Sequence, residues 1–66
     1  RGIVMSEIYE YKIHDFLRKS GGSASKEEIY RAFGGSIEAK RMIDEKLRMM
    51  ERFGLIIIKR GEVRLK

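Results

Sequence analysis

The stretch "SIEAKRMIDEKLRMMERFGLIII", residues 36–58, decides the fold of this chain. Its apolar residues recur every three or four positions, which is the spacing of one face of an α-helix. The stripe consists of Ala39, Ile43, Leu47 and Met50, and Met42, Met49 and Phe53 widen it on one side. Ser36 suits the N-cap of such a helix and Gly54 suits its end. The stretch therefore predicts a long helix from about Ile37 to Phe53, followed by an apolar strand.

The residues after this helix predict a β-hairpin. Ile56 to Ile58 form its first strand, and Val63 to Leu65 return beside it. A two-residue Arg60-Gly61 loop pairs Ile58 with Val63, whereas a three-residue loop that starts at Lys59 pairs Ile57 with Val63. We expect the three-residue loop, because only Gly61 then needs a positive φ angle.

A shorter helix precedes the long one. Ser25 and Glu28 have the spacing of a capping box, and the inner face of the helix that follows consists of Ile29, Ala32 and Phe33. Gly34 and Gly35 allow a tight turn before Ser36. The residues just before the capping box, 22–24, are expected to be extended or irregular.

The first predicted helix begins near Ser6, which we interpret as its N-cap, and ends at Gly21-Gly22. Its apolar face consists of Met5, Tyr9, Ile13, Phe16 and Leu17. Val4, Ile8 and Tyr11 fall on the opposite face. Because a helix with two apolar faces is usually covered on both, we expect a homodimer through these three residues. The alternative is that they are ordinary single exposed apolar residues.

Composition limits the classes of protein that the chain can belong to. Its 66 residues indicate a single domain over residues 1–66, too small for both a core and a large ligand cavity. The sequence has no Cys and a lone His14, and we expect no metal site and no cofactor. We also find no catalytic constellation, and so expect neither an enzyme nor a small-molecule substrate. No apolar run approaches a membrane span, which favours a cytoplasmic protein. The lack of Asn and Gln beside 38% charged residues favours a thermophilic source.

Positive charge gathers toward residue 66. The formal net charge of the chain is +5. Residues 55–66 contribute +3 of it, since Lys59, Arg60, Arg64 and Lys66 stand against Glu62. Such a local cationic excess is able to attract a polyanion.

The order helix, short helix, tight turn, long helix and hairpin resembles the winged helix-turn-helix family. The residues that carry the resemblance are "SKEEIYRAF" (25–33), "GGS" (34–36) and "MIDEKLRMMERFGLIII" (42–58). The resemblance implies an α+β, mostly α fold, with three helices and a C-terminal two-stranded β-hairpin wing. The chain departs from the family in its short wing loop and its long third helix.

The resemblance also implies a function, namely sequence-specific binding of double-stranded DNA by a transcription regulator. In the family, the start of the third helix enters the major groove and the wing lies on the phosphate backbone. The implied contact residues here are Ser36, Ile37, Lys40, Arg41, Asp44, Lys59, Arg60 and Arg64. Arg41 suits guanine, because a guanidinium matches the O6 and N7 acceptors of that base. Ser36 and the first N–H groups of the helix suit a phosphate.

Other interpretations of these residues remain open. Arg41 is also spaced to pair with Glu45, and Asp44 to pair with Arg48. Asp44 repels phosphate, although a carboxylate is able to accept a hydrogen bond from cytosine N4. Lys59 and Arg60 could guard a sheet edge against aggregation. The competing function is a winged helix used as a protein-interaction module from a larger chain or complex.

Overall fold

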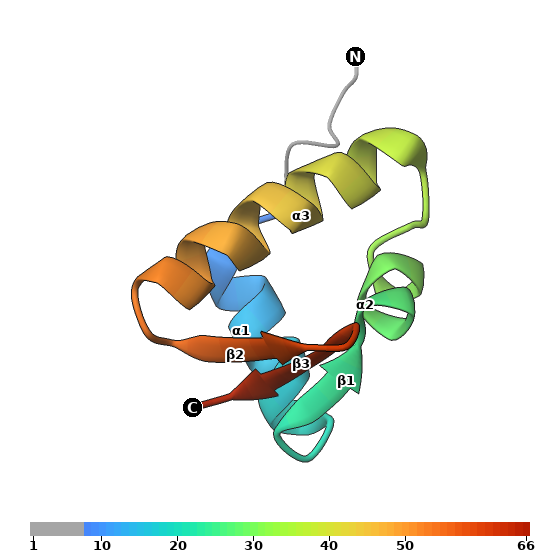
Figure 1. The fold of residues 1–66 in the computed structure, drawn as a ribbon. Coiled ribbons are helices and arrows are strands. Elements are labelled where there is room, and N and C mark those ends of the chain that lie inside the picture. Colours follow the sequence, from blue (N-terminus) through green and yellow to red (C-terminus); the bar gives the residue numbers. More distant parts are fainter. Residues whose placement is uncertain (1–7) are drawn as a thin grey trace.

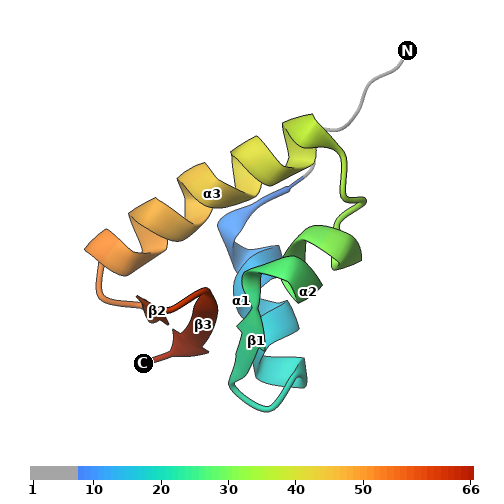
Figure 2. The same ribbon diagram turned by 45° about the vertical axis from the view of Figure 1, so that its right-hand side comes forward.

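The computed structural model describes residues 8–66. These residues form three helices and a three-stranded antiparallel sheet (Figure 1). The elements are α1 (Glu10–Lys19), β1 (Ser23–Ser25), α2 (Lys26–Ala32), α3 (Ile37–Arg52), β2 (Ile56–Lys59) and β3 (Glu62–Leu65). In Figures 1 and 2, α2 lies below the N-terminal half of α3, and the sheet lies below its C-terminal half. The expected α+β class with three helices is confirmed.

The sheet contains one strand more than the expected hairpin. Its order is β1-β3-β2, so that β3 is the central strand. Ala24 pairs with Val63, which pairs on its other side with Ile58. Residues 22–24 were expected to be extended or irregular; Ser23 and Ala24 belong to β1, and this strand allows Ala24 to be buried beside the fully buried Val63.

The hairpin has the two-residue loop, so the expected three-residue register is wrong. Ile58 pairs with Val63, and Lys59 pairs with Glu62. Arg60 has a φ angle of 52° and Gly61 one of 80°, as a type I′ turn requires. Burial explains this register. Ile56 and Ile58 lie on the face of Val63, whereas pairing Ile57 with Val63 would turn the strand over.

The N-caps predicted at Ser25 and Ser36 are both confirmed. The Ser25 hydroxyl accepts a hydrogen bond of 3.1 Å from the Glu28 N–H, and the Glu28 carboxylate accepts one of 3.0 Å from the Ser25 N–H. The Ser36 hydroxyl accepts a 3.0 Å hydrogen bond from the Ala39 N–H. These bonds satisfy N–H groups that the first turn of a helix leaves without a partner. The starts of α2 and α3 are therefore fixed by local sequence.

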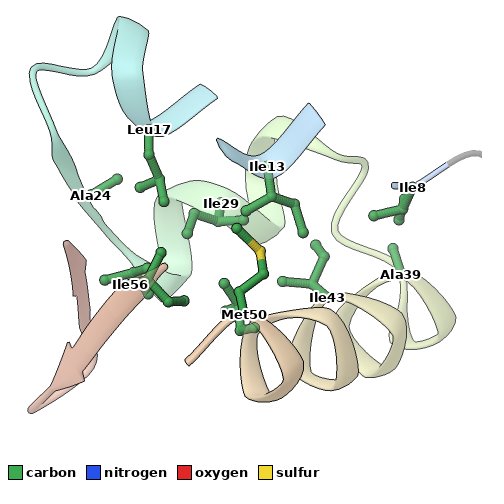
Figure 3. Close-up of a cluster of buried hydrophobic side chains, with 11 residues drawn as sticks. Ile8, Ile13, Leu17, Ala24, Ile29, Ala39, Ile43, Met50 and Ile56 are labelled. Atoms are coloured by element: carbon green, nitrogen blue, oxygen red, sulfur yellow. The ribbon is translucent and has the colours of Figure 1, made fainter. Parts of the chain in front are cut away.

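The core lies where the three helices and the sheet meet, and α2 contributes the fully buried Ile29 (Figure 3). The predicted α3 stripe of Ala39, Ile43, Leu47 and Met50 is buried in it. From α1, Ile13 and Leu17 are fully buried, and Phe16 is partly buried. The prediction that Met49 and Phe53 widen this stripe is wrong, because Met49 is 41% exposed and Phe53 is 67% exposed. Met42 does pack against the core.

The beginning of α1 differs from its prediction. The helix starts at Glu10, and its N-cap residue Tyr9 makes no side-chain capping bond. The proposed cap Ser6 and the apolar residues Val4 and Met5 lie outside the described residues. Tyr9, expected on the core face, is 44% exposed. Ile8 was assigned to an outer dimer face, and this assignment is wrong because Ile8 is buried and lies next to Ala39 (Figure 3).

Candidate nucleic-acid interface

One face of α3 presents four polar or charged side chains and one apolar side chain away from the core. Its members recur at intervals of three, four and seven residues, as one side of a helix requires. They are Ile37, Lys40, Arg41, Asp44 and Arg48, and we call them the α3 outer face. All are exposed except Asp44, which is half-buried. The structure therefore brings the four α3 residues predicted from Ile37 to Asp44 together on one surface.

Ile37 is the most exposed large apolar residue among those that the structure describes, at 76%. It occupies the first position of α3, directly after the cap residue Ser36. The first backbone hydrogen bond of the helix is donated by the Lys40 N–H to the Ser36 carbonyl. The N–H groups of Ile37 and Glu38 come before it and have no carbonyl of the helix to bond to. The exposed start of α3 thus combines free donors with an apolar side chain.

Arg41 is exposed, and its guanidinium takes part in no ion pair within residues 8–66. The side-chain ion pairs in this part of the chain join Asp15 to Arg18 and Lys19, Glu10 to Lys46, and Glu62 to Arg64. The expected pairs of Arg41 with Glu45 and of Asp44 with Arg48 are not formed. Arg41 is therefore available to an external acceptor.

Asp44 is held by α2 instead. Its Oδ1 accepts a 2.5 Å hydrogen bond from the hydroxyl of Tyr30, and the Lys40 ammonium lies 5.7 Å from the centre of the Tyr30 ring. Burial, and then the hydrogen bond and negative charge of Asp44, raise the pKa of Tyr30 to about 12. At neutral pH the hydroxyl is thus protonated and donates, so that Asp44 serves the contact between α2 and α3.

A polar groove of ≈ 320 Å³ connects α3 to the hairpin. Its lining comes from three elements: Lys26 of α2, Ile58 of β2, and Asp44, Leu47, Arg48 and Glu51 of α3. The Lys26 N–H also donates a 2.9 Å hydrogen bond to the carbonyl of Gly61 in the hairpin turn. This bond fixes the turn against the start of α2, so the hairpin tip has a defined place beside the groove.

The three predicted hairpin cations have different surroundings. Lys59 and Arg60 are exposed and directly follow Ile58, which lines the groove. Arg64 pairs in register with Ile57 and Ser23, and its guanidinium lies 3.8 Å from the Glu62 carboxylate. Neither Lys59 nor Arg60 lines the groove: both lie at the hairpin tip, and the Lys59 side chain falls on the face of β2 opposite to that of Ile58. Arg64 is engaged by an acidic neighbour.

Sequence reasoning missed Lys26, Tyr30 and Arg48 as members of this surface. The helical period does place Arg48 on the face of Arg41, seven residues before it, but Arg48 was not among the predicted DNA contacts. Lys26 and Tyr30 reach the surface through contacts with Gly61 and Asp44, which are distant in sequence. No local pattern signals those contacts.

Comparison of the chain with protein-family models, with curated proteins and with solved structures gives no match. Within residues 8–66, no three His, Cys, Asp or Glu side chains come together in a way that could hold a metal ion. In the same range, no helix has both the length and the apolar character that crossing a membrane demands.

Proposed function

We propose that this protein binds double-stranded DNA through the α3 outer face and the β2–β3 hairpin, in the manner of a winged helix-turn-helix regulator. The observation that carries the proposal is the groove that joins these two elements. Lys26 and Arg48 line it, Lys40 and Arg41 lie on the α3 outer face, and Lys59 and Arg60 lie at the tip of the hairpin that contributes Ile58 to the groove. Phosphate contacts from Lys and Arg supply most of the affinity in such complexes.

Within this proposal, α3 enters the major groove by its first two turns. Arg41, exposed and without an ion-pair partner in the described residues, is assigned to guanine. Ile37 is assigned to a thymine methyl group, since apolar side chains commonly contact that group. Asp44 has a positioning role, because its carboxylate holds Tyr30 of α2.

Acidic residues near the proposed contacts limit the electrostatic attraction between the protein and DNA phosphates. Asp44 and Glu51 line the groove beside Lys26 and Arg48, and Glu62 lies across from Lys59. Each carboxylate near phosphate lowers the affinity. We therefore expect binding that depends on a few well-placed cations rather than on the net charge of the domain.

Fluorescence anisotropy of labelled duplex DNA over a salt series tests the proposal. The logarithm of the affinity falls with the logarithm of salt concentration by about 0.9 for each phosphate neutralised. Lys59→Ala/Arg60→Ala should therefore reduce this slope by about 1.8. Lys12→Ala/Lys19→Ala removes the same charge from α1, outside the proposed DNA contacts, and should leave the slope unchanged.

Arg41→Ala separates base contact from phosphate contact. If Arg41 contacts guanine, the variant should lose about 1–3 kcal/mol for a selected site and relax the preference at that base pair. Absence of binding at low salt would contradict the proposal. Equal slopes for the two double variants would mean that the attraction comes from net charge alone.

A further inference from the structure

Exposed apolar side chains gather where α1 meets the end of α3, on a surface that the proposed DNA contacts do not use. A groove of ≈ 390 Å³ lies there, and its apolar lining is Tyr11, Met50 and Leu55. Tyr11 is 67% exposed and Leu55 is 44% exposed. The remaining lining residues are charged or polar and come from α1: Glu10, His14, Asp15 and Arg18.

Two further exposed apolar residues, Met49 and Phe53, lie near the end of α3, and Met49 lines a separate groove with Glu45, Arg48 and Arg52. Lys46 of α3 lies 3.8 Å from Glu10, which lines the groove. Met49 and Phe53 follow Lys46 by three and seven residues, so they lie on the same side of the helix. Both are exposed, Phe53 by 67%. Large apolar residues that cluster rather than scatter mark an interaction site.

The charges of α1 show what kind of partner fits. Glu10, His14 and Arg18 are spaced by four residues, so they form one row along the groove, with the acid in the first turn and the base in the last. Asp15 also lines the groove and pairs with Arg18 of its own chain, as Glu10 pairs with Lys46. An antiparallel copy of α1 would place its Arg18 opposite Glu10 and its Glu10 opposite Arg18. A parallel copy would place like charges opposite each other. Antiparallel helices also bring ends of opposite partial charge together.

We infer that this groove is the interface of a homodimer, in which two α1 helices pack antiparallel about a twofold axis near His14. Each copy covers the Tyr11 and Leu55 of the other, as the self-complementary contact of a twofold dimer requires. Met50 and Ile37 are thirteen residues apart on α3, or about 20 Å along a helix. The dimer therefore leaves the start of α3 open, and it does not depend on the proposed function.

Sedimentation velocity without DNA, from micromolar to near-millimolar protein, tests the location of the interface. The wild-type chain should sediment as a dimer at the upper concentrations. Leu55→Lys places a charge in the groove and should leave a monomer. Ile57→Lys is the matched control, because Ile57 is 42% exposed on the outer side of the sheet and lines no part of the groove. It should dimerise as the wild type does.

A charge exchange tests the antiparallel orientation. Glu10→Arg alone, or Arg18→Glu alone, replaces two attractive contacts by two repulsive ones and should weaken dimerisation about tenfold. Glu10→Arg/Arg18→Glu in one chain restores both contacts and should restore the dimer. An equimolar mixture of the two single variants should form a heterodimer. Each of these variants keeps Tyr11 and Leu55.

Four results would overturn the inference. Three of them are a monomer at every concentration, a dimer that Leu55→Lys leaves intact, and single charge variants that dimerise as well as the wild type. A dimer that is lost equally in the Leu55→Lys and Ile57→Lys variants would also refute this location. None of these results bears on the anisotropy experiment, since DNA binding is measured separately.

Discussion

The hydroxyl of Tyr30 donates a hydrogen bond to the carboxylate of Asp44, and this bond links α2 to α3 across fourteen residues of sequence. The same tyrosine ring lies under the ammonium of Lys40. One side chain of α2 thus orients two members of the α3 outer face. The relationship leads to predictions for stability that do not depend on any ligand.

Tyr30→Phe should lower the free energy of unfolding by about 1 kcal/mol, because it removes one partly exposed hydrogen bond to a carboxylate. Urea denaturation followed by circular dichroism measures this change. Tyr11→Phe is the control: Tyr11 is exposed, and its hydroxyl forms none of the side-chain hydrogen bonds seen within residues 8–66. If both variants lose the same stability, the Tyr30–Asp44 bond contributes nothing measurable.

The raised pKa of Tyr30, about 12 against the ordinary 10, predicts a stability loss in alkali. Because the folded protein holds this proton more tightly than the unfolded chain, the contribution is complete below pH 10 and disappears as the pH rises to about 12. Wild-type stability should therefore fall more steeply across this range than that of Tyr30→Phe. Parallel curves for the two proteins would show that Tyr30 titrates at its ordinary pKa.

Ser25→Ala should destabilise the fold by about 1 kcal/mol, because it removes the hydroxyl acceptor of the capping box. Thermal and urea denaturation both report this loss. Ser20→Ala replaces an exposed serine that follows α1 and should change stability little. An unchanged Ser25→Ala variant would mean that the pairing of β1 with β3 fixes the start of α2 without the cap.

Arg60→Asn should separate the effect of Arg60 on the stability of the hairpin from its effect on DNA binding. Arg60 has a positive φ angle at a turn position where Asn followed by Gly is preferred, so the substitution should stabilise the hairpin by about 0.5 kcal/mol. If Arg60 contacts phosphate, the same change should lower the salt slope of DNA binding by about 0.9. Gly61→Ala, at a φ angle of 80°, should instead destabilise the turn. A variant that is more stable and binds DNA with an unchanged slope would remove Arg60 from the interface.

Local features of the sequence predicted local structure correctly. The caps at Ser25 and Ser36 and the buried stripe of α3 depend on residues within a few positions of one another. The helical period failed for Met49 and Phe53, which it placed beside the core and which are exposed. The pairing of β1, whose residues were expected only to be extended or irregular, and the hairpin register depend on distant neighbours. Strand β1 exists because Ala24 packs beside Val63, and the hairpin register follows from which side of β2 faces the core.

In the candidate site, too, some features follow from local sequence and others depend on residues that are distant in sequence. The helical period places Ile37, Lys40, Arg41 and Asp44 on one face of α3. It could not show that Asp44 is engaged by Tyr30, or that Lys26 reaches the hairpin turn. On α1, the periodicity suggested a face formed by Ile8 and Tyr11, but Ile8 precedes the helix and is buried. The groove instead combines Tyr11 with Leu55, which lies after α3.

The central position of β3 has a consequence for how the protein folds during synthesis. Residues 62–65 sit between β1 and β2, and Val63 completes the core. A ribosome-bound chain that has exposed only the residues before them lacks both Val63 and the strand that pairs with β1 and β2. Folding into the native sheet must therefore wait until residue 65 has left the exit tunnel. Deleting the hairpin would likewise unfold the domain rather than remove a separate arm, so its role in binding has to be measured by point substitutions.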